Sequence, residues 1–320
     1  MKKLLILTLV CTLAVILIPA LTIKAADNNG GTPPPSDTAQ DDTISVYFSD
    51  SDTVEEMDFR EYIIGVVAAE MPVEFHSEAL SAGACAAATL ARLRKSQAQT
   101  DSAVISTDPK IHQAYMTKEE MAEKWEGDFD DYYEKLCAAV DKAIDYSITY
   151  EGELIVPAYH AISPGRTESA ENVWGGSVPY LVSVESPGDS KCEKYLSSLT
   201  LSFDEFSAAL ENEGAVLSED ITLWIGKAEY TNSGTLTAVT IGGKVFSGAK
   251  LREIFSLRSN AVTLSMTKDG VTFTVRGYGH GVGMSQYGAD YLAKNGCTWQ
   301  EIIHHYYTGV DIQKINFNNS

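Results

Sequence analysis

Residues 62–72 read Tyr-Ile-Ile-Gly-Val-Val-Ala-Ala-Glu-Met-Pro, and this stretch predicts a helix with an acidic residue at its end. Ile63 and Val67 lie four positions apart and share one helical face, as core-facing residues do. Pro72 cannot continue a helix, and it pushes the residue before it out of the helical region. Glu70 is therefore expected on the last helical turn.

The last turn of a helix is an unfavourable place for a carboxylate. The free backbone carbonyls there present negative potential, which raises the pKa of a nearby carboxyl group, and apolar neighbours raise it further by desolvation. A carboxylic acid that stays protonated near neutral pH is what general acid catalysis requires. Glu70 is therefore a candidate catalytic acid, and the alternative is a side chain that points into water beyond the helix end.

The composition excludes some classes of partner. The chain has 320 residues and a formal net charge of −20, from 24 Lys and Arg against 44 Asp and Glu. Nucleic-acid binders need basic surface, so no nucleic acid is expected as a partner. An anionic polymer would have to be held locally by hydrogen bonds and stacking, for which the 16 Tyr and 4 Trp residues are suitable.

The N-terminus is typical of a membrane anchor. Lys2 and Lys3 precede an uncharged, mostly apolar run to Ile23 that is long enough to cross a bilayer. We expect residues 1–26 to be an uncleaved signal anchor, with a cleaved signal peptide as the alternative. Residues 27–42 are rich in Asn, Gly, Pro, Thr and Asp and predict a flexible tether, which leaves residues 43–320 as one extracytoplasmic domain.

The rest of the chain predicts an α+β fold with separate helices and antiparallel hairpins in one elongated domain. Three capping boxes, at Thr117, Ser202 and Thr298, predict helix starts. Ser77 is expected to cap a further helix that runs to about Lys95. The remaining expected features are a helix over residues 130–144 and one over 247–255, a polar loop over 163–176, and strands over 43–48, 148–150, 154–161, 180–184, 221–230, 235–241, 262–266 and 271–275.

A glycine-rich loop, residues 276–288, reads Arg-Gly-Tyr-Gly-His-Gly-Val-Gly-Met-Ser-Gln-Tyr-Gly. Alternating glycines allow a ligand to approach the backbone, and the alternative is a tight connection between a strand and a helix. No Lys-Ser/Thr follows, which excludes a phosphate-binding P-loop. The cysteines have no CxxC spacing and the histidines have no HxxxH spacing, so we expect no metal and no cofactor.

Taken together, several ordered segments resemble the sporulation stage II protein D family, membrane-anchored lytic transglycosylases of spore-forming bacteria. The resemblance extends from about Tyr47 to Tyr307. The matching segments are 66–72 (Val-Val-Ala-Ala-Glu-Met-Pro), 159–160 (Tyr-His), 165–168 (Gly-Arg-Thr-Glu), 171–175 (Glu-Asn-Val-Trp-Gly), 179–181 (Pro-Tyr-Leu), 184–187 (Val-Glu-Ser-Pro), 255–259 (Phe-Ser-Leu-Arg-Ser), 277–288 and 305–307 (His-Tyr-Tyr).

The resemblance implies an activity. It implies cleavage of the MurNAc–GlcNAc bond in peptidoglycan strands that lack stem peptides, with a 1,6-anhydro product, during engulfment of the forespore. It implies Glu70 as the catalytic acid, and an amidase or endopeptidase and a membrane scaffold as partners at the cell membrane. The candidates for holding the sugar hydroxyls and the lactyl carboxylate are His160, Ser163, Arg166, Tyr278, His280, Ser285 and Gln286.

Two departures from the family pattern matter. The family often has an Arg in its second helix, where this chain has Ala88, so any basic role there is lost. Some members bind zinc through a Cys and a His, but Ser106 stands at the Cys position here, although His112 persists. Because a serine hydroxyl is a poor zinc ligand, we expect no tightly bound structural zinc.

Two other functions remain open from the sequence. Related sequences include amidase enhancers, so the chain could instead be a non-catalytic cell-wall binding protein that activates an amidase. It could also be an ordinary hydrolase, with Glu168 or Glu171 as the second carboxylate that most glycosidases use.

Overall fold

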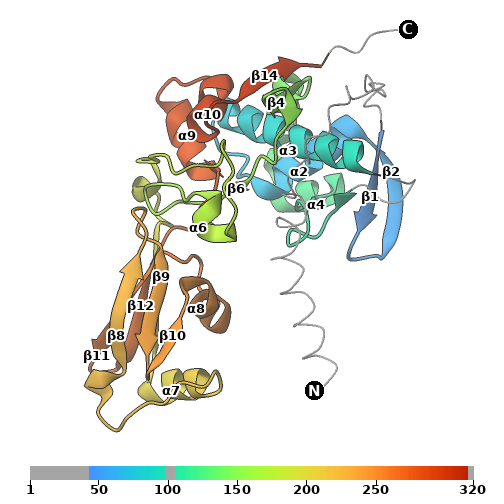
Figure 1. Cartoon of the computed structure of the whole chain (residues 1–320). Coiled ribbons are helices and arrows are strands. Elements are labelled where there is room, and N and C mark those ends of the chain that lie inside the picture. Colours follow the sequence, from blue (N-terminus) through green and yellow to red (C-terminus); the bar gives the residue numbers. More distant parts are fainter. Residues whose placement is uncertain (1–42, 99–104, 316–320) are drawn as a thin grey trace.

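The computed structural model describes residues 43–98 and 105–315. These residues form an α+β fold, as predicted. Figure 1 shows a helix-rich body that contains both ends of the described chain, and a strand-rich lobe that extends from it. No helix in residues 43–98 and 105–315 is long and apolar enough to cross a membrane. The expected anchor (1–26) and tether (27–42) lie outside the described residues.

The helix-rich body is built around α3. Its helices are α2 (Phe59–Glu70), α3 (Ser77–Gln97), α4 (Lys118–Trp125), α5 (Phe129–Ala143), α9 (Gln286–Lys294) and α10 (Trp299–Tyr306). Helix α3 contacts α2, α5, α9 and α10, and its many alanines are buried in these contacts. Alanine is the strongest helix former and has the smallest side chain with a Cβ, so the sequence of α3 favours both the helix and close approach of its neighbours.

Two small sheets flank these helices. The first has the order β2-β1-β3, with β1 (Thr43–Phe48) antiparallel to β2 (Thr53–Asp58) and parallel to β3 (Ile105–Ser106). The second has the order β14-β4-β5 and consists of β14 (Asp311–Lys314), β4 (Tyr146–Tyr150) and β5 (Glu153–Leu154).

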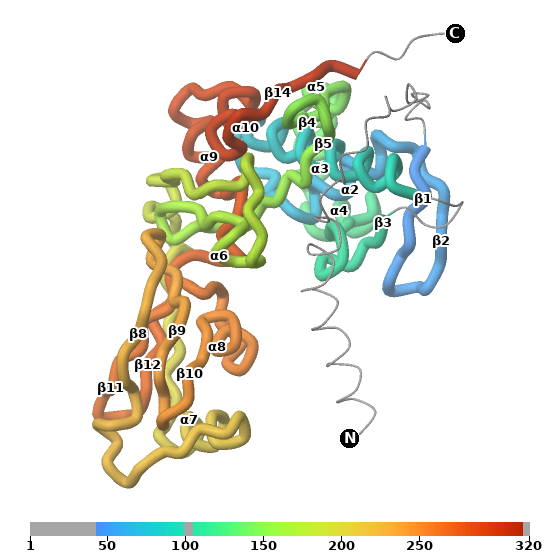
Figure 2. The backbone as a smooth tube through the Cα atoms, in the orientation of Figure 1, coloured from blue at the N-terminus to red at the C-terminus, as the bar shows by residue number. Residues whose placement is uncertain are grey.

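The strand-rich lobe has a hydrophobic core of its own, separate from that of the helix-rich body. The lobe contains two antiparallel three-stranded sheets with the orders β10-β9-β8 and β11-β12-β7 (Figure 2). Its core includes Phe206 and Phe273. The strands are β7 (Leu196–Leu201), β8 (Ile225–Tyr230), β9 (Leu236–Ile241), β10 (Lys244–Phe246), β11 (Val262–Thr267) and β12 (Gly270–Arg276). Two helices, α7 (Phe203–Glu211) and α8 (Gly248–Phe255), complete the lobe.

The segments between the two cores position the candidate site. The short strands β6 (Tyr159–His160) and β13 (Met284–Ser285) pair in parallel and join segments far apart in the sequence. Helix α6 (Ala170–Trp174) lies where the lobe meets the body (Figure 1). Short 3-10 helices occur at Glu126–Asp128, Asp189–Lys191 and Ile221–Leu223.

Several predicted boundaries differ from the structure. All three capping boxes are confirmed, but α3 is capped by His76, whose Nδ1 accepts the Glu78 N–H at 3.2 Å. The predicted loop 163–176 contains α6, and of the expected strand 154–161 only the parts in β5 and β6 are regular. Residues 180–184 form no strand. The Leu181 carbonyl accepts the Ala170 N–H and the Val184 carbonyl accepts the Thr167 N–H, and these separate bonds do not form a continuous ladder.

Candidate active site

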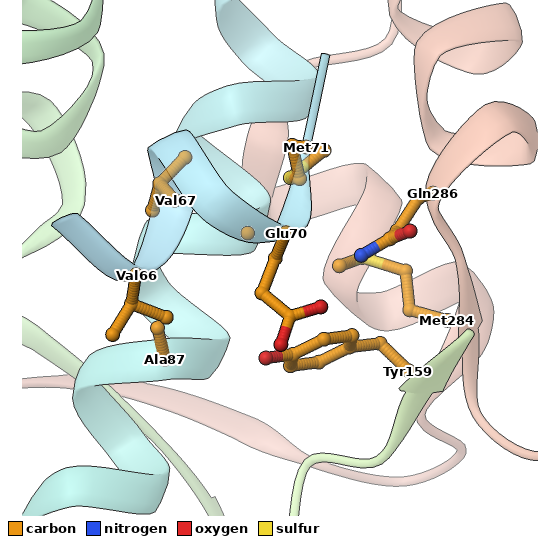
Figure 3. A pocket seen from close by; sticks show the side chains of 9 residues that line it. Val66, Val67, Glu70, Met71, Ala87, Tyr159, Met284 and Gln286 are labelled. Atoms are coloured by element: carbon orange, nitrogen blue, oxygen red, sulfur yellow. The ribbon is translucent and has the colours of Figure 1, made fainter. Parts of the chain in front are cut away.

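Glu70 is the last residue of α2, as predicted. Met71 caps the helix in an extended conformation (φ −120°, ψ 137°), and its N–H still bonds to the Val67 carbonyl. The residue before a proline favours this conformation, so Pro72 sets the point at which the helix ends. Glu70 is half-buried, and its carboxylate points to a small pocket between α2, α3 and the β6/β13 pair (Figure 3).

Burial raises the pKa of the Glu70 carboxyl above its ordinary value. Three hydrogen bonds oppose this effect, because donors to a carboxylate favour the ionised form. The Ala114 backbone N–H donates to Oε1 at 2.9 Å, and the side chains of Tyr159 and Gln286 also bond to the carboxyl group. The net shift is upward, so the carboxyl holds its proton to higher pH than a free Glu does.

A chain of hydrogen bonds fixes the groups that surround Glu70. The Tyr62 hydroxyl donates to Gln113 Oε1 at 3.3 Å, and Gln113 Nε2 donates to the Tyr159 hydroxyl, also at 3.3 Å. Gln113 and Tyr62 are fully buried. Tyr62 orients Gln113, and Gln113 in turn orients the Tyr159 hydroxyl. Tyr159 therefore presents this hydroxyl to Glu70 in a fixed orientation.

The pocket beside Glu70 is small. Its other lining residues are mostly apolar, and they are Val66, Val67, Met71, Gly83, Ala87, Tyr159, Met284 and Gln286. About 10 Å³ is open to the centre of a water molecule, which is about the space that one water needs. A sugar ring does not fit in this volume, but one hydroxyl or glycosidic oxygen does. The pocket therefore has room for one small polar group beside the Glu70 carboxyl.

The glycine-rich loop places Gln286 by packing tightly against the β6 segment. A Cβ at Gly283, where φ is 72°, would lie 2.0 Å from the Ala158 carbonyl oxygen. A Cβ at Gly277 would lie 2.6 Å from the Ile162 carbonyl oxygen. These two glycines thus allow close contacts within the protein. This favours the interpretation of the loop as a tight connection between a strand and a helix.

Of the eight candidate residues, Glu70 and Gln286 line the pocket. His160 is buried and its Nδ1 lies 3.1 Å from the Val282 carbonyl, while its ring lies 5.7 Å from that of His280. Burial lowers the pKa of His160 to about 3 and that of His280 to about 4. Both rings are therefore neutral near pH 7.

Ser163 and Ser285 are completely buried around Asp189, a residue that the sequence analysis did not select. The Asp189 carboxylate accepts the Ser163 N–H at 2.8 Å and the Ser285 hydroxyl at 2.7 Å. Ser285 in turn caps α9, whose first residue is Gln286. The two serines thus fix the loops around the site from within the protein, and direct contact with sugar hydroxyls would require them to be exposed.

The other two candidates lie outside the Glu70 pocket. Arg166 donates to the Ser183 carbonyl at 3.2 Å and pairs loosely with Glu185 at 3.4 Å. Tyr278 is 48% exposed, with the Arg258 guanidinium 5.6 Å from its ring centroid.

The position of the family arginine is in the interior of this chain. Ala88 is fully buried. At Gly83, on the same helix, the Met71 sulfur would lie 2.2 Å from an added Cβ. Arg92, one turn further along α3, donates to the Ile144 and Tyr146 carbonyls. No residue that lines the Glu70 pocket carries a positive charge.

The surroundings of Ser106 concern the expectation about structural zinc, and those of Glu168 concern the alternative of a hydrolase with a second carboxylate. The Ser106 N–H donates to His112 Nδ1 at 3.0 Å, and residues 43–98 and 105–315 hold no group of three metal-ligating side chains. Glu168 is fully buried and accepts hydrogen bonds from Thr231 at 2.5 Å and Asn172 at 2.9 Å. It does not line the Glu70 pocket, and neither does Glu171.

The sequence analysis did not select Tyr159, Gln113 or Ala114 as site residues. The signal was present, because Tyr159 belongs to a segment that carries the resemblance and Gln113 to the Gln-Ala-Tyr that follows His112.

The sequence was also compared with known protein families and proteins. The family model described as "Stage II sporulation protein" matches residues 47–150. Stage II sporulation protein D of Bacillus amyloliquefaciens is 38% identical over 275 residues, which cover 85% of this chain and 79% of that protein. The Bacillus subtilis protein of the same name is 36% identical over the same shares. This chain therefore belongs to the stage II sporulation protein D family.

A more distant relative has a different name. The amidase enhancer of Bacillus subtilis is 26% identical over 299 residues, which cover 78% of this chain and 40% of that protein.

Proposed function

We propose that this sporulation protein is a lytic transglycosylase that cleaves the MurNAc–GlcNAc bond of peptidoglycan strands. The supporting observation is the Glu70 pocket, which combines one carboxyl group of raised pKa with no second carboxylate in its lining. Most glycosidases use two carboxylates. A transglycosylase needs one, because a hydroxyl of the substrate itself serves as the nucleophile.

In the proposed reaction Glu70 acts first as an acid and then as a base. Protonated Glu70 donates its proton to the glycosidic oxygen as the bond from that oxygen to C1 of MurNAc breaks. The C6 hydroxyl of the same MurNAc attacks C1 and passes its proton to the Glu70 carboxylate. The products are a 1,6-anhydro end and a free GlcNAc hydroxyl, and Glu70 ends the cycle protonated.

The surroundings of Glu70 suit both roles. Burial favours the protonated acid, while the donors from Ala114, Tyr159 and Gln286 stabilise the carboxylate that forms after proton transfer. Because the pocket has room for about one water, a substrate hydroxyl that enters it would displace the competing nucleophile.

The cellular setting belongs to the same proposal. Residues 1–26 would anchor the protein by a single pass in the cell membrane and place residues 43–320 outside the cytoplasm. The substrate would be glycan strands already stripped of stem peptides by a partner amidase or endopeptidase. A membrane scaffold would hold these enzymes together during engulfment.

A second candidate function is activation of an amidase by a non-catalytic wall-binding protein. It is favoured by the similarity to the amidase enhancer. It would require binding of glycan but no acid at position 70.

The test is product analysis with stripped and unstripped glycan strands. Glu70→Gln keeps the shape of the side chain but removes the acid, so we expect glycan binding without cleavage. Glu171→Gln is the matched control, because Glu171 is exposed and outside the pocket. Mass spectrometry of the products should find anhydro ends, which are lighter than reducing ends by one water. Reducing ends would indicate a hydrolase, and wall digestion by Glu70→Gln equal to that of the native protein would reject the proposal.

A further inference from the structure

A second, larger site lies between the body and the lobe. We call it the junction groove, and it is an open groove of about 660 Å³, within the size range of small-ligand pockets. Its lining residues are Arg166, Asn172, Ser183, Tyr230, Thr231, Asn232, Ser233 and Thr237. None of them lines the Glu70 pocket, so the two sites are separate.

Hydrogen bonds across the junction give the groove a fixed floor. The Ser233 hydroxyl, from the lobe, donates to the Thr167 carbonyl at 2.9 Å and lies 3.2 Å from the Ser183 hydroxyl. Thr231 donates to the buried Glu168 carboxylate. A ligand would therefore meet a surface whose hydroxyls are already oriented by protein partners.

Other polar groups of the groove lack a partner. Within the part of the chain that the structure describes, no hydrogen bond forms to the Asn232 amide or to the Tyr230 hydroxyl. Asn232 is exposed, and Tyr230 is 42% exposed and offers part of its ring to the solvent. An amide beside an aromatic ring is a combination that suits a sugar, which has both hydroxyls and apolar C–H faces.

The charge of the groove is opposite to that of the protein. Arg166 is the only charged residue in its lining, although the chain carries a net charge of −20. Its partner Glu185 is 75% exposed and 3.4 Å away, so the pairing is weak. A ligand carboxylate can therefore bind the guanidinium in place of Glu185.

We propose that the junction groove binds a saccharide that carries a carboxylate, as a holding site separate from the Glu70 pocket. A peptide ligand fits less well, because the groove has no aliphatic side chain to receive peptide side chains. That the saccharide is MurNAc of the glycan strand rests on the proposed function. The preference for an acidic saccharide does not.

The test is an NMR titration of the full chain carrying Glu70→Gln, which prevents cleavage. The probes are a peptide-free GlcNAc–MurNAc tetrasaccharide, tetragalacturonate, neutral chitotetraose and a glutamate tetrapeptide. We expect the backbone amides of Asn232 and Ser233 to shift with both acidic saccharides, and with chitotetraose only at about tenfold higher concentration. The tighter of the two acidic saccharides identifies the source of the ligand.

Variants assign the binding to the groove. Tyr230→Ala and Asn232→Ala, both at exposed positions, should each weaken the tetrasaccharide binding about tenfold. Arg166→Gln should abolish the preference for acidic over neutral saccharides. The control is Lys227→Gln. Lys227 is an exposed cation on β8, the strand of Tyr230, but it lies outside the groove, so its replacement should leave saccharide binding unchanged.

The proposal is overturned if the amides do not shift, if none of the groove variants weakens the binding, or if the tetrapeptide binds more tightly than the saccharides. These readouts require no turnover. The transglycosylase proposal can therefore fail while the groove binds saccharide, and the reverse is also possible.

Discussion

The backbone N–H of Ala114 donates a 2.9 Å hydrogen bond to the Glu70 carboxylate, across 44 residues of sequence. The segment that carries Ala114 is held against α2 by a second bond, from the Met116 N–H to the Gly65 carbonyl at 3.1 Å. The position of the donor at Glu70 therefore depends on how closely this segment approaches Gly65.

Gly65→Ala should disturb the site without touching it. The new Cβ would lie 2.2 Å from the Tyr115 ring and 2.8 Å from the Met116 carbonyl oxygen, so the segment must move outward. We expect a loss of about 1–3 kcal/mol in unfolding free energy from the overpacking. A displaced Ala114 should lower glycan cleavage tenfold or more. Chemical denaturation measures the unfolding free energy, and the rate at which cleaved glycan forms measures the activity.

Gly127→Ala is the matched control for this variant. No atom lies within 4 Å of the Cβ that it adds, so stability and activity should stay at native values. Native activity in Gly65→Ala would show that Ala114 does not support Glu70.

The pH dependence of cleavage should follow the pKa of Glu70. The acid must be protonated, so activity falls as the pH rises through this raised pKa. Tyr159→Phe removes a donor that favours the carboxylate, so the pKa rises further and the fall in kcat/KM moves to higher pH. Gln286→Leu should move it in the same direction. Tyr150→Phe removes a hydroxyl that bonds to no described residue and should leave the profile in place. A shift of the Tyr159→Phe profile to lower pH would contradict the assignment.

Local sequence predicted the parts of the fold that depend on local contacts. A capping box is complete within four residues, and all three were correctly identified. Strand β2 reads Thr-Val-Glu-Glu-Met-Asp and is mostly exposed, so no apolar alternation marks it. Strands β7 and β14 likewise take their pairing from β12 and β4, which are distant in the sequence. Such strands exist because of their partners, which a single stretch does not reveal.

The same division applies to the site. The position of Glu70 at the end of α2 was predictable, because Pro72 follows it closely in the sequence. Its partners Ala114, Tyr159 and Gln286 come from three other segments, and tertiary packing alone brings them together. The interior positions of Ser163 and Ser285 depend on Asp189, whose role appears only when the loops are folded.

Glu70→Gln should make the protein more stable near neutral pH. The folded-state pKa of Glu70 is raised, so the stability that its protonated form provides is complete below the unfolded pKa, about 4.3. This stability is lost as the pH rises through the folded pKa. The neutral Gln avoids that loss, and we expect a gain in unfolding free energy near pH 7 that vanishes in acid. Thermal unfolding of both proteins across the pH range measures it. A variant that is less stable than the native protein at pH 7 would argue against a raised pKa.

Asp189→Ala should lower both stability and cleavage. The change leaves the Ser163 N–H buried without its acceptor, which costs about 1–3 kcal/mol. It also removes the shorter bond of the Ser285 hydroxyl, which keeps the Ala161 carbonyl as an acceptor at 3.2 Å. Gln286 directly follows Ser285, so loss of this anchor should also release the side chain that lines the Glu70 pocket. Asp189→Asn keeps one acceptor oxygen and should fall between the native protein and the alanine variant. Asp269→Ala, in the exposed β11–β12 turn, serves as the control and should change unfolding free energy by less than about 0.5 kcal/mol. If Asp189→Ala cleaved glycan at the native rate well below its unfolding temperature, Asp189 would support the fold but not the position of Gln286.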